Sequence, residues 1–95
     1  MNDKVMFTKT LEECMRSLRF DLDTLKVQTS IEAPMTPEVS EDIYLLQEKL
    51  DVLEKGLAEL TSASPQFWPK VKTVVSKALE DASSSIQFAK QRYLH

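Results

Sequence analysis

The sequence predicts an all-α protein, an antiparallel three-helix bundle with up-down-up order. Apolar residues recur at steps of three and four along three segments, which is the spacing of a buried helix face. One glycine and four prolines are too few for the turns of a many-stranded sheet. The segments are of similar length and short connectors join them, as in antiparallel bundles. The helices are expected at about 5–29, 37–61 and 69–93.

The first predicted helix, about 5–29, is identified by a continuous apolar stripe. No glycine or proline interrupts this segment, so nothing in it opposes helix formation. The stripe consists of Phe7, Leu11, Cys14 or Met15, Leu18, Leu22 and Leu25.

The second predicted helix, about 37–61, has the clearest pattern in the chain. Thr36 is a suitable capping residue, and Pro37 suits the first helical position. The apolar residues that follow alternate steps of four and three without a slip, which is a heptad seam. The seam consists of Val39, Ile43, Leu46, Leu50, Leu53, Leu57 and Leu60.

Leu45 and Val52 lie seven residues apart beside this seam. On a helical wheel they widen the apolar arc to about half of the circumference, which suits a helix with two neighbours. Gly56 lies on the widened side, where the missing side chain permits a close approach of another helix.

The third predicted helix, about 69–93, begins near Pro69 and has an alanine-rich stripe that allows close packing. The stripe consists of Val71, Val75, Ala78, Ala82, Ile86, Ala89 and Tyr93. Residues 31–64 hold eight acidic and two basic side chains, whereas residues 65–95 hold five basic and two acidic ones. This charge difference favours contact between the second and third helices.

We expect residues 1–95 to form a single domain, because a chain of this length builds one modest core. The pattern leaves open how firmly the first helix is attached and whether the chain self-associates. The alternative to the three-helix bundle is a long coiled-coil hairpin with a loosely attached first helix. The uninterrupted heptad also permits self-association, in which a dimer would form a four- or six-helix assembly.

Several classes of function have no support in the sequence. The single cysteine, Cys14, and the single histidine, His95, exclude a disulfide framework and a zinc finger. No nucleophile motif or glycine-rich phosphate loop is present, so we predict no catalytic residue, no cofactor site and no metal site. The net charge of −3 and the pI near 5.1 argue against nucleic-acid binding.

The sequence also contains no apolar run of the ~20 residues that a membrane span needs. The first residues lack the apolar core of a signal peptide. We therefore expect a cytoplasmic protein without a membrane span, and a free Cys14 suits a reducing compartment.

Apolar residues outside the stripes are the candidate partner-binding residues. The alternative for each is that it fills a groove inside the bundle, and for the tryptophan that its ring closes one bundle end. Trp68 belongs to the aromatic cluster Phe67-Trp68-Pro69, and tryptophan is frequent at binding hot spots. The six candidates are Phe20, Val27, Leu45, Val52, Trp68 and Phe88.

These features predict a small noncatalytic protein-binding module: an adaptor, a chaperone-like protein or an assembly subunit. Its partner would be another, helical protein that packs on exposed apolar helix positions, and a homodimer is compatible with the heptad. The alternative is a small helical enzyme or a ligand-binding regulator with a pocket between helices. That alternative needs polar side chains that point inward, and the stripes contain almost none.

Two substitutions test this interpretation. Leu50→Asp should unfold the bundle, because it places a carboxylate in the middle of the seam. If the surface around Phe20 and Val27 binds the partner, Phe20→Glu should keep the helical circular-dichroism spectrum and abolish binding. Loss of the spectrum in Phe20→Glu would instead assign Phe20 to the core.

Overall fold

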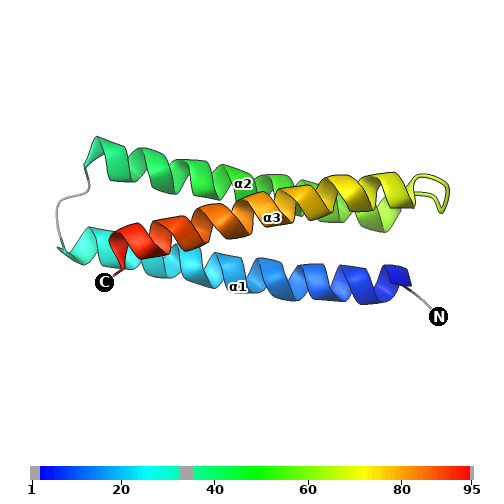
Figure 1. Ribbon diagram of the computed structural model, residues 1–95, viewed down its shortest axis with the longest axis horizontal. Coiled ribbons are helices and arrows are strands. Elements are labelled where there is room, and N and C mark those ends of the chain that lie inside the picture. The colour runs from blue at the N-terminus through cyan, green and yellow to red at the C-terminus, as the bar shows by residue number, and fades with distance from the viewer. Residues whose placement is uncertain (1–2, 33–35, 95) are drawn as a thin grey trace.

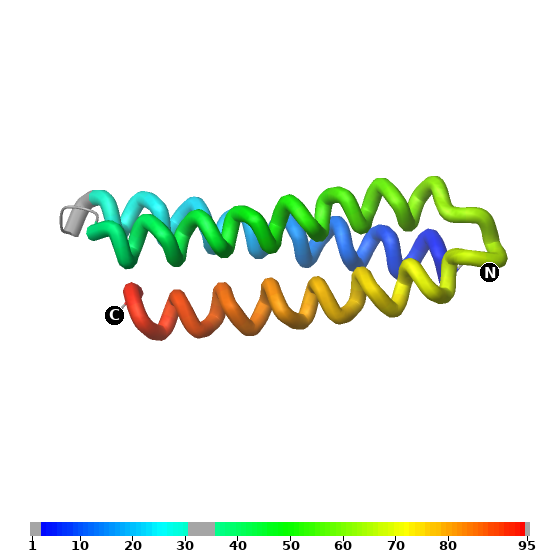
Figure 2. The backbone as a smooth tube through the Cα atoms, turned by 90° about the horizontal axis from the view of Figure 1, so that it is seen from above, coloured from blue at the N-terminus to red at the C-terminus, as the bar shows by residue number. Residues whose placement is uncertain are grey.

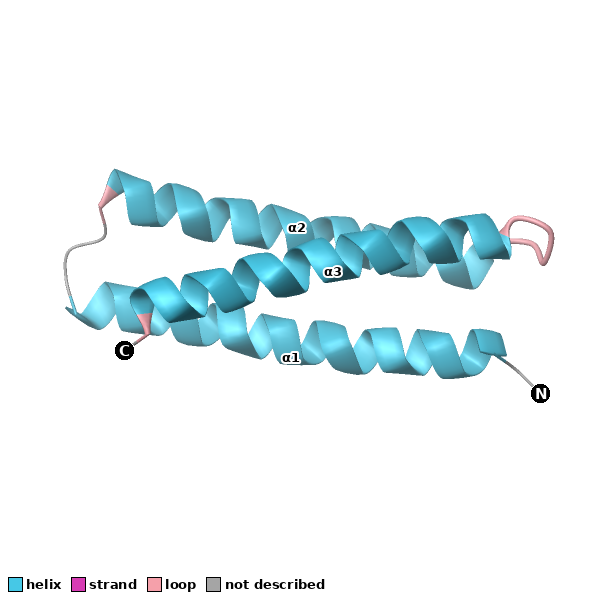
Figure 3. Cartoon of the chain, viewed as in Figure 1, coloured by secondary structure: helices cyan, strands magenta, loops and turns pink. Residues whose placement is uncertain are grey.

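The chain forms three long helices that pack side by side (Figures 1 and 3). The computed structural model describes residues 3–32 and 36–94. Helix α1 spans Asp3–Glu32, α2 spans Pro37–Ser62 and α3 spans Trp68–Tyr93. Each helix contacts both others, and the described residues contain no strand, so the predicted all-α three-helix bundle is confirmed.

The bundle is elongated, with extents of 49 × 21 × 16 Å. All three helices run along the long axis, and α2 is antiparallel to both α1 and α3 (Figures 1 and 2). The short connection between α2 and α3 closes one end of the bundle, and α3 ends at the opposite one (Figure 2).

Helix α1 is longer than the predicted 5–29, whereas α2 and α3 agree with their predicted bounds to within one residue. The hydroxyls of Thr29 and Ser30 donate to the carbonyls of Leu25 and Lys26, each at 2.7 Å. These polar residues are thus accommodated inside the helix instead of ending it. The helix stops shortly before Pro34, in agreement with the steric limits that a proline imposes on the preceding chain. His95 lies outside the described residues.

The starts of α2 and α3 agree with the predicted signals. The Thr36 hydroxyl accepts a hydrogen bond from the Val39 N–H at 3.2 Å, and Pro37 occupies the first helical position. Before α3, the Ser64 carbonyl accepts from the N–H groups of Phe67 and Trp68, each at 3.0 Å. This turn reverses the chain and brings α3 back along α2.

The core is made of apolar side chains from all three helices, and the buried residues among those described are all apolar. In α1, Met15 is buried and Cys14 is half-buried, which resolves the alternative at that step of the stripe. Most of the residues in the predicted stripes are buried. The stripe residues that are only partly buried are Phe7, Val39, Leu57, Val71, Ala78 and Tyr93. The core consists of Leu11, Met15, Leu18, Leu22, Leu25, Ile43, Leu46, Leu50, Leu53, Leu60, Val75, Ala82, Ile86 and Ala89.

The widened apolar arc of α2 is covered only in part, although α2 has two neighbours. Leu45 and Val52 are both exposed. The flanks that α2 turns toward its neighbours are polar. Toward α1, Lys26 donates to Gln47 at 3.0 Å and Arg19 pairs with Glu54; toward α3, Lys49 pairs with Asp81 at 2.6 Å. Because polar pairs complete both contacts, the two apolar residues beside the seam remain at the surface.

Helix α1 is attached to both other helices, so the hairpin alternative is wrong. Besides its core residues, α1 pairs with α2 through Arg19 and Glu54. It pairs with α3 through Asp21 and Lys90, whose charged atoms lie 3.5 Å apart.

Gly56 marks a close approach of α2 and α3, as its position beside the seam predicts. A Cβ atom added at Gly56 would lie 2.9 Å from Cγ2 of Val75, which is closer than a van der Waals contact. Val75 is buried and β-branched, so its side chain has little freedom to move away.

Gly56→Ala should therefore destabilise the bundle although alanine favours helices. The gain in helix propensity is about 1 kcal/mol, and overpacking of a core costs about 1–3 kcal/mol. We expect a net loss of about 1 kcal/mol in the free energy of unfolding by urea titration.

The matched background is Val75→Ala, which removes the methyl groups that the new Cβ would meet. There, Gly56→Ala should stabilise the protein. Stabilisation by Gly56→Ala in the unaltered chain would contradict the close approach.

Candidate functional site

A groove of about 350 Å³ lies between α2 and α3 and is the main candidate for a binding site. Leu46 and Ala89 are buried and belong to its floor, whereas Leu45 and Phe88 are exposed. Both helices contribute to its lining, which consists of Asp42, Leu45, Leu46 and Lys49 of α2 and Ser84, Ser85, Phe88, Ala89, Arg92 and Tyr93 of α3. Two of the residues predicted to bind a partner, Leu45 and Phe88, therefore meet at one groove.

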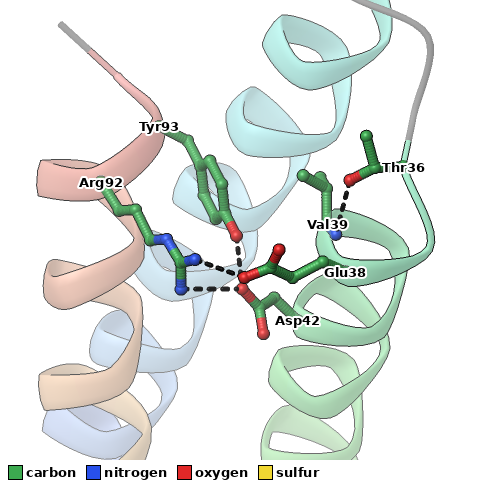
Figure 4. A network of polar contacts seen from close by, with 6 residues as sticks. All are labelled: Thr36, Glu38, Val39, Asp42, Arg92 and Tyr93. Atoms are coloured by element: carbon green, nitrogen blue, oxygen red, sulfur yellow. Dashed lines mark hydrogen bonds and ion pairs between the residues drawn. The ribbon is translucent and has the colours of Figure 1, made fainter.

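A polar network closes one end of the groove and joins the start of α2 to the end of α3 (Figure 4). Arg92 donates from Nη2 to Oε1 of Glu38 at 2.6 Å, and its Nη1 lies 3.5 Å from Oδ2 of Asp42. The Tyr93 hydroxyl donates to Asp42, and the Arg92 guanidinium lies 5.4 Å from the centre of the Tyr93 ring. The network fixes which residues of the two helices lie level with each other.

The network also changes the acidity of two of its members. The hydrogen bond to the Asp42 carboxylate, followed by partial burial, raises the pKa of Tyr93 above its ordinary value of 10.0. The hydrogen bond to Glu38 raises the pKa of Arg92. Both groups therefore keep their protons at neutral pH, and both remain hydrogen-bond donors.

The exposed apolar surface continues along α2 and α3 beyond the groove. Val74, Asp81 and Phe88 are spaced by seven residues and share one face of α3. Asp81 pairs across to Lys49 of α2, so that face borders α2. Val74 is not among the six candidates, because in the sequence it stands next to Val75 at the margin of the core stripe. Its spacing from Phe88 is the signal that identifies it.

We call the residues Leu45, Val52, Val74 and Phe88 the α2/α3 face. Their exposed fractions are 45%, 56%, 66% and 67%, respectively. The Lys49–Asp81 ion pair crosses between the two helices within this surface. The face thus has two apolar parts separated by one charged pair.

Two other candidates lie elsewhere on the molecule. Phe20 and Val27 are exposed on α1, on the side opposite the buried Leu18 and Leu25. They therefore do not fill a groove inside the bundle. With exposed fractions of 72% and 54%, they form a separate surface that a single helix presents.

Trp68 lies at an end of the bundle and is less exposed than the other five candidates. It is half-buried against the core, and its ring meets the Phe7 ring edge to face with centroids 6.0 Å apart. Nζ of Lys72 lies 5.2 Å from both ring centres. The tryptophan therefore closes the end where α1 and α3 begin, which is the alternative given by the sequence.

The described residues contain no group of three or more histidine, cysteine or acidic side chains placed to hold a metal ion. None of the described helices is both long and apolar enough to cross a membrane. Comparison of the chain with protein-family models, curated proteins and solved structures finds no significant match.

Tyr93→Phe should destabilise the protein at neutral pH, because it removes the hydrogen bond to Asp42. We expect a loss of about 1 kcal/mol or less, since solvent screens a partly exposed bond. The raised pKa means that the bond contributes fully below pH 10.0 and is lost as the pH rises through the folded-state value. Urea titrations of both proteins at neutral and alkaline pH should show their difference shrinking as Tyr93 ionises. A difference that stays constant across this range would contradict the assignment.

Proposed function

We propose that the chain is a small noncatalytic protein-binding module whose binding surface is the α2/α3 face. The observation that supports this most directly is the groove at which Leu45 of α2 and Phe88 of α3 meet. Exposed apolar side chains scattered singly are ordinary, whereas a connected apolar surface is typical of interaction sites. Here two adjacent helices expose apolar residues at heptad spacing.

The shape of the face favours a helical partner. A helix laid along two antiparallel helices places its apolar residues in the depression between them. Full burial of an aliphatic or phenylalanine side chain contributes about 1.5–3 kcal/mol. The four residues of the face can therefore supply much of the energy of such a contact. Adaptor, chaperone-like and assembly roles all use this mode of binding.

We further propose a cytoplasmic location for this module. The thiol of Cys14 is free and half-buried. A single unpaired thiol suits a reducing compartment.

The surface around Phe20 and Val27 remains the second candidate. It exposes large apolar side chains, as the sequence predicts, but a single helix presents them, and neither residue lines the groove between α2 and α3. A partner helix would meet one ridge there, whereas at the α2/α3 face it meets a groove with two walls. The larger contact favours the α2/α3 face.

The experiment is affinity capture of the tagged chain from its native lysate at moderate salt, read by mass spectrometry. The binding-face variant carries Leu45→Glu and Phe88→Glu. The matched control carries Phe20→Glu and Val27→Glu on α1. Because all four residues are exposed, both variants should keep the helical circular-dichroism spectrum. We expect the bound protein to be recovered with the unaltered chain and with the control, and to be lost from the binding-face variant.

Recovery of the same protein with both variants would overturn the assignment to the α2/α3 face. Loss from the control alone would move the binding surface to α1. Recovery of nothing beyond the bait, with an untagged copy of the chain also left unbound, would contradict the binding function itself.

A further inference from the structure

Charged residues border the α2/α3 face, and their signs differ between the two helices. On α2 the exposed side chains beside Leu45 and Val52 are mainly acidic. The acidic ones are Glu41, Glu48 and Glu59, and Lys55 is a basic exception. On α3 the exposed side chains beside Val74 are basic: Lys70 and Lys77. Neither the three glutamates nor Lys70 and Lys77 take part in an ion pair among the described residues. The apolar face thus lies between an acidic border and a basic border.

Helical spacing places these charges beside the residues of the α2/α3 face. Glu59 is seven residues from Val52, in the same row, and Glu48 is four residues before Val52. Lys70 and Lys77 are four residues before and three residues after Val74. Lys77 is also seven residues before Ser84, which lines the groove. A helix that covers the face therefore meets acids on one side and lysines on the other.

We infer that the occupant of the α2/α3 face is a second copy of this chain, in a symmetric dimer. In it, α2 of each copy lies antiparallel over α3 of the other, and the four helices form a second core around the residues of the face. The inference rests on the proposed function, because it takes the α2/α3 face as the binding surface and names its partner.

Charge selects this arrangement among the symmetric ones. A two-fold axis parallel to the helices places the acidic α2 over the basic α3 of the other copy. A two-fold axis across the helices places α2 over α2, so that the acidic rows repel each other. Opposite charges along the edges of packed helices set orientation and partner choice in coiled coils. The first arrangement is therefore favoured.

The register of the dimer follows from contacts already present inside one copy. Glu38 pairs with Arg92, and Lys49 pairs with Asp81, which fixes the level of α2 against α3. A two-fold axis parallel to the helices leaves the position of every residue along the helix direction unchanged. Glu59 of one copy then lies level with Lys70 of the other. By the same rule, Leu45 lies level with the groove segment that contains Ser84 and Phe88.

The area of the face is sufficient for a stable dimer. Helices α2 and α3 each have 26 residues. At 1.5 Å per residue and a diameter of about 10 Å, two such helices present a face of roughly 800 Å². A standard protein interface covers about 800 Å² on each partner. A second copy that covers this whole side of the bundle, with the four residues of the α2/α3 face at its centre, therefore matches what a specific dimer requires.

Sedimentation velocity of the purified chain across the micromolar range tests the inference. We expect a monomer–dimer equilibrium in the unaltered chain, and Leu45→Glu should weaken the dimer at least about tenfold. Lys70→Glu with Lys77→Glu should weaken it, and so should Glu48→Lys with Glu59→Lys. Mixing these two charge-reversed variants should restore a dimer that contains one copy of each, because both acidic–basic contacts are then complete.

The control reverses two charges on the opposite side of the molecule, Lys9→Glu with Arg16→Glu on α1, and should leave the dimer unchanged. If the unaltered chain remains monomeric across the whole micromolar range, the inference is overturned. A dimer that survives Leu45→Glu, or charge-reversed variants that fail to pair when mixed, would overturn it as well. A monomer that still captures a different protein through Leu45 and Phe88 would overturn only the dimer and leave the proposed function standing.

Discussion

The burial of one stripe of α2 between α1 and α3 is the constraint on which the rest of the arrangement depends. Leu50, Leu53 and Leu60 are almost completely removed from solvent. Their steps of three and four residues trace one line along the helix, and both neighbours pack on that line. The neighbours leave the side of α2 next to this stripe open. The exposed face at Leu45 and Val52 is therefore a result of how the core is built.

Charge acts twice on the same pair of helices. Inside one copy, Arg92 of α3 joins Glu38 and Asp42 of α2, so the acidic and the basic helix lie side by side in a defined register. The outward rows of the two helices repeat the same difference in sign. Surface ion pairs contribute little stability one by one, but they discriminate between alternative alignments of apolar helices. A leucine-rich seam fits many alignments, so this discrimination is what the charges add.

Periodicity was sufficient to predict the three helices, the order of the bundle and most core residues, because burial follows directly from the spacing of apolar residues. It was not sufficient for Leu45 and Val52, since a helical wheel gives the width of an apolar arc but not how much of it a neighbour covers. The meeting of Leu45 with Phe88 depends on the register between α2 and α3, which ion pairs far apart in sequence determine. Trp68 is ambiguous in sequence because the same ring can close a bundle end or anchor a partner.

The two ends of the α2–α3 pair are held by different forces. At the end with the connecting turn, Gly56 allows the backbone of α2 to approach the buried Val75 closely. At the opposite end, polar links from Arg92 and Tyr93 supplement the core, and water and salt weaken the exposed ion pair of Arg92 with Glu38. Local unfolding starts where protection by packing is weakest. Partial opening of the bundle therefore has a direction: the last turns of α3 detach first, and amide hydrogens there exchange with solvent before those near the turn.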